Sequence, residues 1–259
     1  MKNWMWSVGI VIVTAASSWF MPASAQTQAG VKNVVLVHGA WVDGSGWKPV
    51  CDILVRDGYT VSIVQEPLTS FAEDVAAVRR VMDLQSAPFV LVGHSYGGSV
   101  ITEAGSDAKV AALVYVAAHM PDAGESEAGD GKKFPSDLAR STYVRKTPDN
   151  FNYLDPGEFR TYFAADLPTA QADFEARSQM LTAIANFGGT ITTPAWRSKP
   201  SWMIVAGSDR IINPELERWY AKRAQSHVRE LTGASHSVYE SRPKEVAAVI
   251  EEAARAAGR

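Results

Sequence analysis

The chain has 259 residues, with 28 acidic and 25 basic side chains and a formal net charge of −3. This length suits one α/β domain with an insertion, and the charge balance gives no reason to expect a nucleic-acid partner. Cys51 is the single cysteine, so no disulfide can form within the chain and the fold must depend on its hydrophobic core. Apolar residues surround Cys51 at helical spacing, which predicts a buried structural thiol.

The first 25 residues have the pattern of a cleavable signal peptide. Lys2 precedes an apolar segment of about a dozen residues, which is shorter than a membrane span. Ala23-Ser24-Ala25 then forms an A-x-A cleavage site before Gln26. We therefore predict a periplasmic or secreted protein whose mature chain, residues 26–259, keeps no stable membrane anchor. The alternative is an uncleaved N-terminal anchor.

Beyond residue 26, short apolar runs alternate with segments of helical periodicity. Strands are expected over residues 34–37, 59–64, 89–92, 110–117, 201–206 and 227–231. Helices are expected over residues 47–56, 71–84, 99–104, 214–224 and 243–257. This alternation predicts an α/β fold, in which a mostly parallel sheet carries helices on both faces.

The alternation breaks between residues 120 and 199. Residues 122–135 are predicted to be a loop, and residues 155–167 and 169–186 two helices with apolar or aromatic stripes. An insertion of this length between two core strands would form a small helical lid over the strand ends, where open α/β sheets bind ligands. Its aromatic side chains would either pack the lid onto the body or line a pocket. The expected lining residues are Trp41, His119, Phe163 and Met180.

Ser95 is the candidate nucleophile. It lies in Gly93-His94-Ser95-Tyr96-Gly97-Gly98, between the apolar run of residues 89–92 and the helical segment 99–104. A serine between a strand and a helix sits on a tight turn, and the flanking glycines let the backbone close around it. Such a turn holds the hydroxyl clear of the sheet. The alternative is an ordinary turn serine.

His236 and Asp209 are the candidate base and acid. A serine hydroxyl needs a base, and the base needs a third group to orient it. His236 lies in a loop of small residues between the last expected strand and the last helix, and Asp209 directly follows the strand at 201–206. The alternatives are an exposed loop histidine and a helix-capping aspartate. His38 and His94 are expected to be structural.

The oxyanion of a tetrahedral intermediate needs backbone donors. The turn His38-Gly39-Ala40-Trp41 follows the first expected strand, so the N–H of Ala40 and the N–H of Tyr96 are the expected pair. The spacing of histidines and carboxylates fits no metal site, and there is no glycine-rich phosphate loop. We therefore expect neither a metal nor an organic cofactor.

With these motifs the chain resembles the α/β-hydrolase superfamily over nearly all of its mature length. The turn at residues 38–41, the segment 114–121 and the small lid look like the branch of small carboxylesterases, plant methyl esterases and hydroxynitrile lyases. The resemblance implies a Ser95–Asp209–His236 triad with Ala40 and Tyr96 as oxyanion donors. The lyases of that branch carry a lysine directly after the catalytic histidine, where this chain has Ser237.

The resulting expectation is an exported serine hydrolase. It would cleave carboxylic esters of small to medium apolar or aromatic substrates through an acyl-enzyme. Two alternatives stay open at this level. One is a C–C lyase or a cofactor-free peroxidase-like enzyme on the same triad, and the other is a non-catalytic protein that binds a small molecule with this fold.

Overall fold

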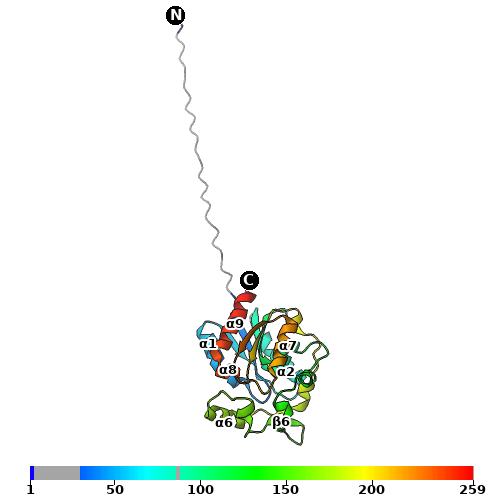
Figure 1. The fold of residues 1–259 in the computed structure, drawn as a ribbon. Coiled ribbons are helices and arrows are strands. Elements are labelled where there is room, and N and C mark those ends of the chain that lie inside the picture. The colour runs from blue at the N-terminus through cyan, green and yellow to red at the C-terminus, as the bar shows by residue number, and fades with distance from the viewer. Residues whose placement is uncertain (3–29, 86–87, 259) are drawn as a thin grey trace.

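The computed structural model describes residues 1–2, 30–85 and 88–258, and its core is a six-stranded sheet in the order β2-β1-β3-β4-β8-β9 (Figure 1). The strands pair in parallel throughout this sheet. They are β1 Asn33–Val37, β2 Thr60–Ile63, β3 Phe89–Ser95, β4 Val110–Ala118, β8 Ser201–Ala206 and β9 His227–Leu231. The predicted α/β class and parallel sheet are therefore confirmed. The predicted signal peptide lies almost entirely outside the described residues.

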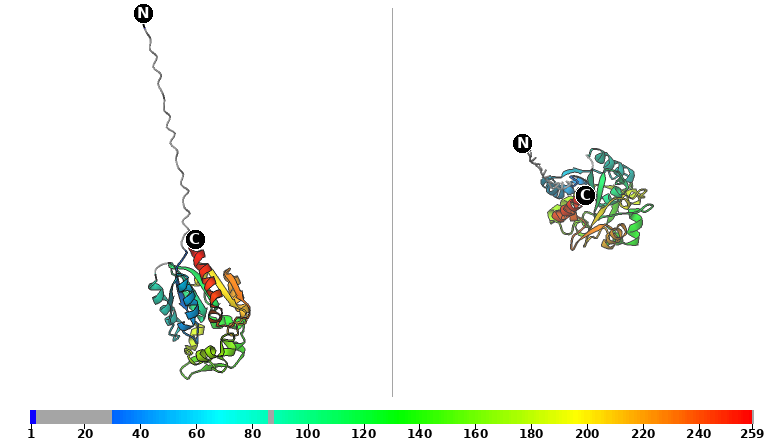
Figure 2. Two further views of the ribbon diagram at one scale, coloured as in Figure 1. Left: turned by 90° about the vertical axis from the view of Figure 1, so that its left-hand side faces the viewer. Right: turned by 90° about the horizontal axis from the view of Figure 1, so that it is seen from above.

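Helices cover both faces of the sheet (Figure 2). One face carries α1 Lys48–Arg56, α8 Val238–Ser241 and α9 Pro243–Ala257, and the other carries α2 Phe71–Asp83, α3 Tyr96–Ala104 and α7 Pro214–Ala224. Successive strand residues point to opposite faces. Val34 and Leu36 therefore belong to the core on the side of α1, α8 and α9, and Val35 and Val37 to the core on the side of α2, α3 and α7. Strands buried on both faces are unbroken apolar runs for this reason.

Cys51 is less buried than its sequence context predicts. It is only partly buried on α1, because Val50 and Leu54 occupy the fully buried positions of that helix. Burial nevertheless raises the pKa of the Cys51 thiol. None of the helices in the described part of the chain has the length and apolar character needed to cross a membrane.

Residues between β4 and β8 form a lid at the end of the sheet opposite the C-terminus, where α6 and β6 are labelled in Figure 1. Its helices are α4 Glu127–Lys133, α5 Phe159–Tyr162 and α6 Thr169–Arg177. Its strands β5 Val144–Lys146, β6 Phe151–Leu154 and β7 Thr182–Ala183 form a small antiparallel sheet. The lid also contains the short 3-10 helices η2 Leu138–Arg140, η3 Ile184–Gly188 and η4 Ala195–Arg197, and a further one, η1 Gly44–Trp47, precedes α1.

The lid differs from its prediction in three places. The expected helix 155–167 is reduced to the single turn α5, Phe159–Tyr162. The expected loop at 122–135 contains α4, whose start is capped by the Ser126 hydroxyl accepting from Gly129 N. The expected helix 169–186 ends at Arg177. There the Gln179 side chain bonds the main chain of Leu154, and residues 182–183 pair with β6. Strand pairing across the lid thus replaces the helix that the apolar spacing predicts.

Asp74 joins three parts of the fold that surround the end of β3. Its carboxylate is fully buried and accepts hydrogen bonds from Leu68 N (2.8 Å), Tyr96 OH (2.7 Å) and Asn186 Nδ2 (2.8 Å). Burial raises the pKa of Asp74 to about 6, although the bonds from Tyr96 and Leu68 act in the opposite direction. Helix α2, the start of α3 and the lid turn η3 therefore meet at one buried acid.

We predict that ionisation of Asp74 makes the stability of the fold depend on pH. The folded protein holds this proton up to a pKa of about 6, whereas the ordinary value is 3.8. The free energy of unfolding should therefore fall as the pH rises through that window, by at most about 3 kcal/mol relative to Asp74→Asn. Urea unfolding of both proteins at about pH 4 and pH 7.5 measures this difference.

Asp83→Asn, on the exposed end of the same helix, controls for the loss of a carboxyl group. A difference between wild type and Asp74→Asn that stays constant between the two pH values would contradict the prediction.

Candidate active site

Ser95 occupies the turn between β3 and α3. Its backbone has φ 54° and ψ −123°, and 5% of the residue is exposed. The turn is pressed between neighbouring strands. An added Cβ at Gly97 would lie 2.3 Å from the His38 carbonyl oxygen, and one at Gly98 would lie 2.3 Å from the His119 carbonyl oxygen. Only glycine permits this approach, so the motif holds the serine in a strained conformation.

The structure brings His236 and Asp209 to Ser95. His236 Nε2 lies 2.8 Å from Ser95 Oγ, and His236 Nδ1 lies 2.6 Å from Asp209 Oδ2. A carboxylate can only accept, so Nδ1 carries the proton and Nε2 is left to accept from the serine hydroxyl. The second Asp209 oxygen accepts from the N–H groups of Ile211 (2.7 Å) and Ile212 (2.9 Å). The aspartate is therefore fixed in the orientation that this tautomer requires.

The lid holds the histidine loop in place. The Phe163 carbonyl accepts from Ser237 N (2.9 Å). The Phe163 ring stands edge-on to the His236 ring, with 4.7 Å between the ring centroids. Asp166 accepts from both the N–H and the hydroxyl of Ser235. Phe163, predicted to line the pocket, is instead fully buried against His236. Its role depends on tertiary packing that the helical stripe does not reveal.

The expected oxyanion turn packs directly on Ser95. An added Cβ at Gly39 would lie 2.7 Å from Ser95 Cβ, so the main chain that leads into Ala40 passes beside the serine. Tyr96 is the first residue of α3, where a backbone N–H has no acceptor within the helix. The N–H groups proposed from the sequence therefore belong to the two turns that border the Ser95 side chain.

Trp41 is clamped by the lid. It has a positive φ of 66°, and its N–H donates to Thr182 Oγ1 (3.1 Å) while its indole Nε1 donates to Asn152 Oδ1 (2.9 Å). Its carbonyl accepts from Met180 N (3.1 Å). These bonds fix the residue that follows Ala40. Met180, expected in the pocket lining, contributes this main-chain bond and is not among the residues that line the cavity described next.

A cavity of about 490 Å³ opens beside these groups. Its walls include Trp41 and His119, two of the four side chains expected from the sequence to line a pocket, and Ile211 and Ile212 beside Asp209. The rest of the lining is mainly apolar, with Phe134, Leu138, Val144, Phe187 and Leu216. The triad itself is not part of the lining, but His119 N bonds the Ser95 carbonyl (3.2 Å), so the cavity adjoins the serine.

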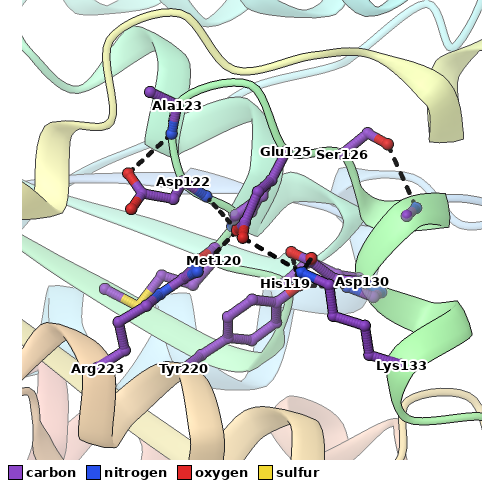
Figure 3. Close-up of polar contacts among 12 residues, drawn as sticks. His119, Met120, Asp122, Ala123, Glu125, Ser126, Asp130, Lys133, Tyr220 and Arg223 are labelled. Atoms are coloured by element: carbon purple, nitrogen blue, oxygen red, sulfur yellow. Dashed lines mark hydrogen bonds and ion pairs between the residues drawn. The ribbon is translucent and has the colours of Figure 1, made fainter.

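A polar network fixes one wall of this cavity to α7 (Figure 3). His119 Nε2 lies 3.2 Å from Glu127 Oε1, and the hydroxyl of Tyr220 donates to Asp130 (2.9 Å). Arg223 donates to Glu125 (2.7 Å) and to the Met120 carbonyl (2.7 Å), as Figure 3 shows. Segment 119–133 is thereby held on the helix that follows the Asp209 turn.

His38 and His94 are fully buried and bond to backbone groups, as expected of structural histidines. His38 Nε2 accepts from Glu66 N (2.9 Å), and His94 Nε2 lies 3.0 Å from the His236 carbonyl. Burial lowers the pKa of both imidazoles. Within residues 30–85 and 88–258, no group of three His, Cys, Asp or Glu side chains is arranged to hold a metal ion.

Sequence reasoning missed Asp74 and Asp166, which support the site, and the buried Glu217, whose side chain accepts from Ala206 N at the end of β8 (3.2 Å). Only Glu217 left a signal. It shares the inward face of α7 with Tyr220 and Ala221, at spacings of three and four, so its burial could have been predicted.

Comparisons with known proteins agree with this architecture. Residues 34–249 match the alpha/beta hydrolase family. Methylesterase 7 of Arabidopsis thaliana is 26% identical over 252 residues, which cover 86% of this chain and 96% of that protein.

Two solved structures share the fold. Polyneuridine aldehyde esterase superposes with a TM-score of 0.73 at 20% identity, covering 86% of this chain and 98% of its own. The pyrethroid hydrolase PytH gives a TM-score of 0.73 at 22% identity, covering 88% of this chain and 99% of its own. With most of its length matched, from β1 into α9, the chain belongs to the alpha/beta hydrolase family.

Proposed function

We propose that the protein is a serine hydrolase that cleaves carboxylic esters through an acyl-enzyme. The observation that carries the proposal is the unbroken chain from Asp209 through His236 to Ser95 Oγ, at 2.6 and 2.8 Å. A base within hydrogen-bond reach of a hydroxyl, itself oriented by a carboxylate, is the arrangement that activates a serine. The relatives named as esterases support the same reaction class.

The reaction follows from the positions of these groups. His236 Nε2 takes the hydroxyl proton as Ser95 Oγ attacks the ester carbonyl carbon, and Asp209 stabilises the imidazolium. The N–H groups of Ala40 and Tyr96 donate to the oxyanion. The imidazolium then protonates the departing alcohol, which leaves the acyl group on Ser95. His236 next deprotonates a water molecule that attacks the acyl carbon. The imidazolium then returns the proton to Ser95 Oγ as the acid leaves.

The cavity beside the serine supports a substrate with an apolar or aromatic body. Most of its lining is hydrocarbon or aromatic, and about 490 Å³ is enough for a small to medium ester. The residue directly after His236 is Ser237 and not a lysine, so the site lacks the charge with which related lyases steady cyanide. This favours hydrolysis over the lyase alternative.

Replacing the triad residues should abolish turnover. In Ser95→Ala the burst of nitrophenol from a nitrophenyl ester should disappear, and His236→Ala should lower kcat by about 10⁴- to 10⁶-fold, because triad members act as a unit. His227→Ala, on an exposed strand residue, is the control and should keep the wild-type rate. Rapid-mixing absorbance measures the burst.

A loss of less than tenfold in His236→Ala would mean that the base lies elsewhere. Absence of a burst from wild type with all ester chain lengths would favour the binding-protein alternative, and cleavage of mandelonitrile would favour the lyase.

Filling the cavity should discriminate against bulky substrates. Val144 is half-buried in the cavity wall, and Val144→Trp should lower kcat/KM for nitrophenyl phenylpropanoate by at least about tenfold while changing that for nitrophenyl acetate by less than about threefold. Leu84→Trp, at a side chain that is 83% exposed, controls for the added indole. Equal losses with both esters would show that the bulky group binds somewhere else.

We further propose that the protein is exported, on the basis of its first 25 residues. Expression of the full chain in a bacterium should give periplasmic or secreted protein that begins at Gln26, as read by N-terminal sequencing. Ala25→Leu should block cleavage, because the site requires a small residue. Exported wild-type protein that retains Met1 would contradict the cleavage site.

A further inference from the structure

A second carboxyl group, that of Glu217, is buried behind the Asp209 turn. Glu217 lies on α7 and is 0% exposed. Its Oε2 accepts from Ala206 N, at the end of β8, at 3.2 Å. Its other oxygen, Oε1, is buried and meets no hydrogen-bond donor among the residues that the structure describes. An ionised carboxylate would leave this oxygen unsolvated, at a considerable cost in free energy.

The neighbouring acid is Asp209, because both residues bond the main chain of Ala206: Glu217 Oε2 accepts from its N–H (3.2 Å), and Asp209 N donates to its carbonyl (3.1 Å). The two carboxyl groups therefore meet at the turn that follows β8 and act on each other. Two oxygens that can only accept do not bond to each other, so one of the two groups has to carry a proton. Asp209 accepts hydrogen bonds from two backbone N–H groups and from His236 Nδ1, whereas Glu217 accepts one, from a backbone N–H. The negative charge is therefore better stabilised on Asp209, and the proton belongs on Glu217.

The charges around Glu217 agree with this assignment. Burial raises the pKa of Glu217 well above its usual range, and the neighbouring Asp209 raises it further. Arg218 acts in the opposite direction, but its guanidinium is bound to Glu215 and Glu230 at 2.6 Å each on the solvent side of α7.

The geometry points to Glu217 as a protonated acid that donates a hydrogen bond to Asp209 and thereby positions the Asp209–His236 pair. Its part in turnover rests on the hydrolase function proposed above. Asp209 would then be held by donors from its own turn and from α7, which keeps Oδ2 directed at His236 Nδ1. Glu217 touches neither the substrate nor the reacting atoms, so it is a positioning residue.

Two substitutions distinguish the effect of the hydrogen-bond donor of Glu217 from the effect of its side-chain volume. Glu217→Gln keeps an acceptor for Ala206 N and supplies an N–H for Asp209. Glu217→Met keeps the length of an unbranched side chain but removes both. Glu215→Gln, at an exposed position of the same helix, controls for loss of a glutamate.

The protonation state can be measured without any substrate. Infrared difference spectra of wild type minus Glu217→Gln, recorded in D₂O near neutral pH, should contain the C=O stretch of a protonated carboxylic acid. The other buried acids are present in both proteins and cancel. A difference that contains carboxylate bands alone would overturn the assignment.

The positioning role is measured by kinetics on the same proteins. Glu217→Met should lower kcat for a nitrophenyl ester by about 10- to 100-fold and change KM by less than about twofold, the range expected for one hydrogen bond to a charged group. Glu217→Gln should stay within about threefold of wild type. A wild-type kcat in Glu217→Met, or a Glu217→Gln variant as slow as Glu217→Met, would overturn the role.

The infrared experiment and the kinetic experiment can fail independently of each other. If wild type hydrolyses no ester, the proposed function fails while the infrared experiment still decides the protonation of Glu217. If Glu217→Met does not fold, as judged by circular dichroism, the infrared spectrum and the rate of Glu217→Gln decide the proposal.

Discussion

The buried hydrogen-bonded chain of Asp209, His236 and Ser95 is the constraint that the rest of the structure serves. Asp209 and His236 follow β8 and β9, and Ser95 is the last residue of β3. The carboxyl ends of these strands meet at one edge because the strands are parallel. Polar groups removed from water must be fully hydrogen-bonded, or the fold loses stability. Backbone N–H groups at residues 211 and 212 satisfy the aspartate, and the His94 imidazole bonds the His236 carbonyl.

The lid is part of this arrangement and does more than cover it. Phe163 and Asp166 hold the loop that carries His236, and Thr182 and Asn152 hold Trp41 beside the turn at residues 38–41. The same insertion supplies one wall of the cavity, which the polar network of Figure 3 fixes to α7. The positions of His236 and Ser95 and the shape of the cavity therefore depend on the same contacts between lid and body.

The limits of prediction from the sequence follow from the range of the interactions. The core strands were predictable because strands covered on both faces are continuous apolar runs, and Ser95 because glycines must flank a turn pressed against His38 and His119. The small sheet of the lid was not predictable from the sequence. Its strands β6 and β7 lie far apart in the chain, and their pairing overrides a local helical stripe. The contact of Phe163 with His236 likewise exists only in three dimensions.

The most direct test of the account is to trap the acyl-enzyme. Wild-type protein mixed with a nitrophenyl ester and quenched in acid during the burst should yield one acylated peptide by mass spectrometry, with the acyl group on Ser95. The adduct should be absent from His236→Ala, because the hydroxyl is not activated without its base. An acyl group on any other residue, or ester turnover with no covalent adduct under these conditions, would contradict the account.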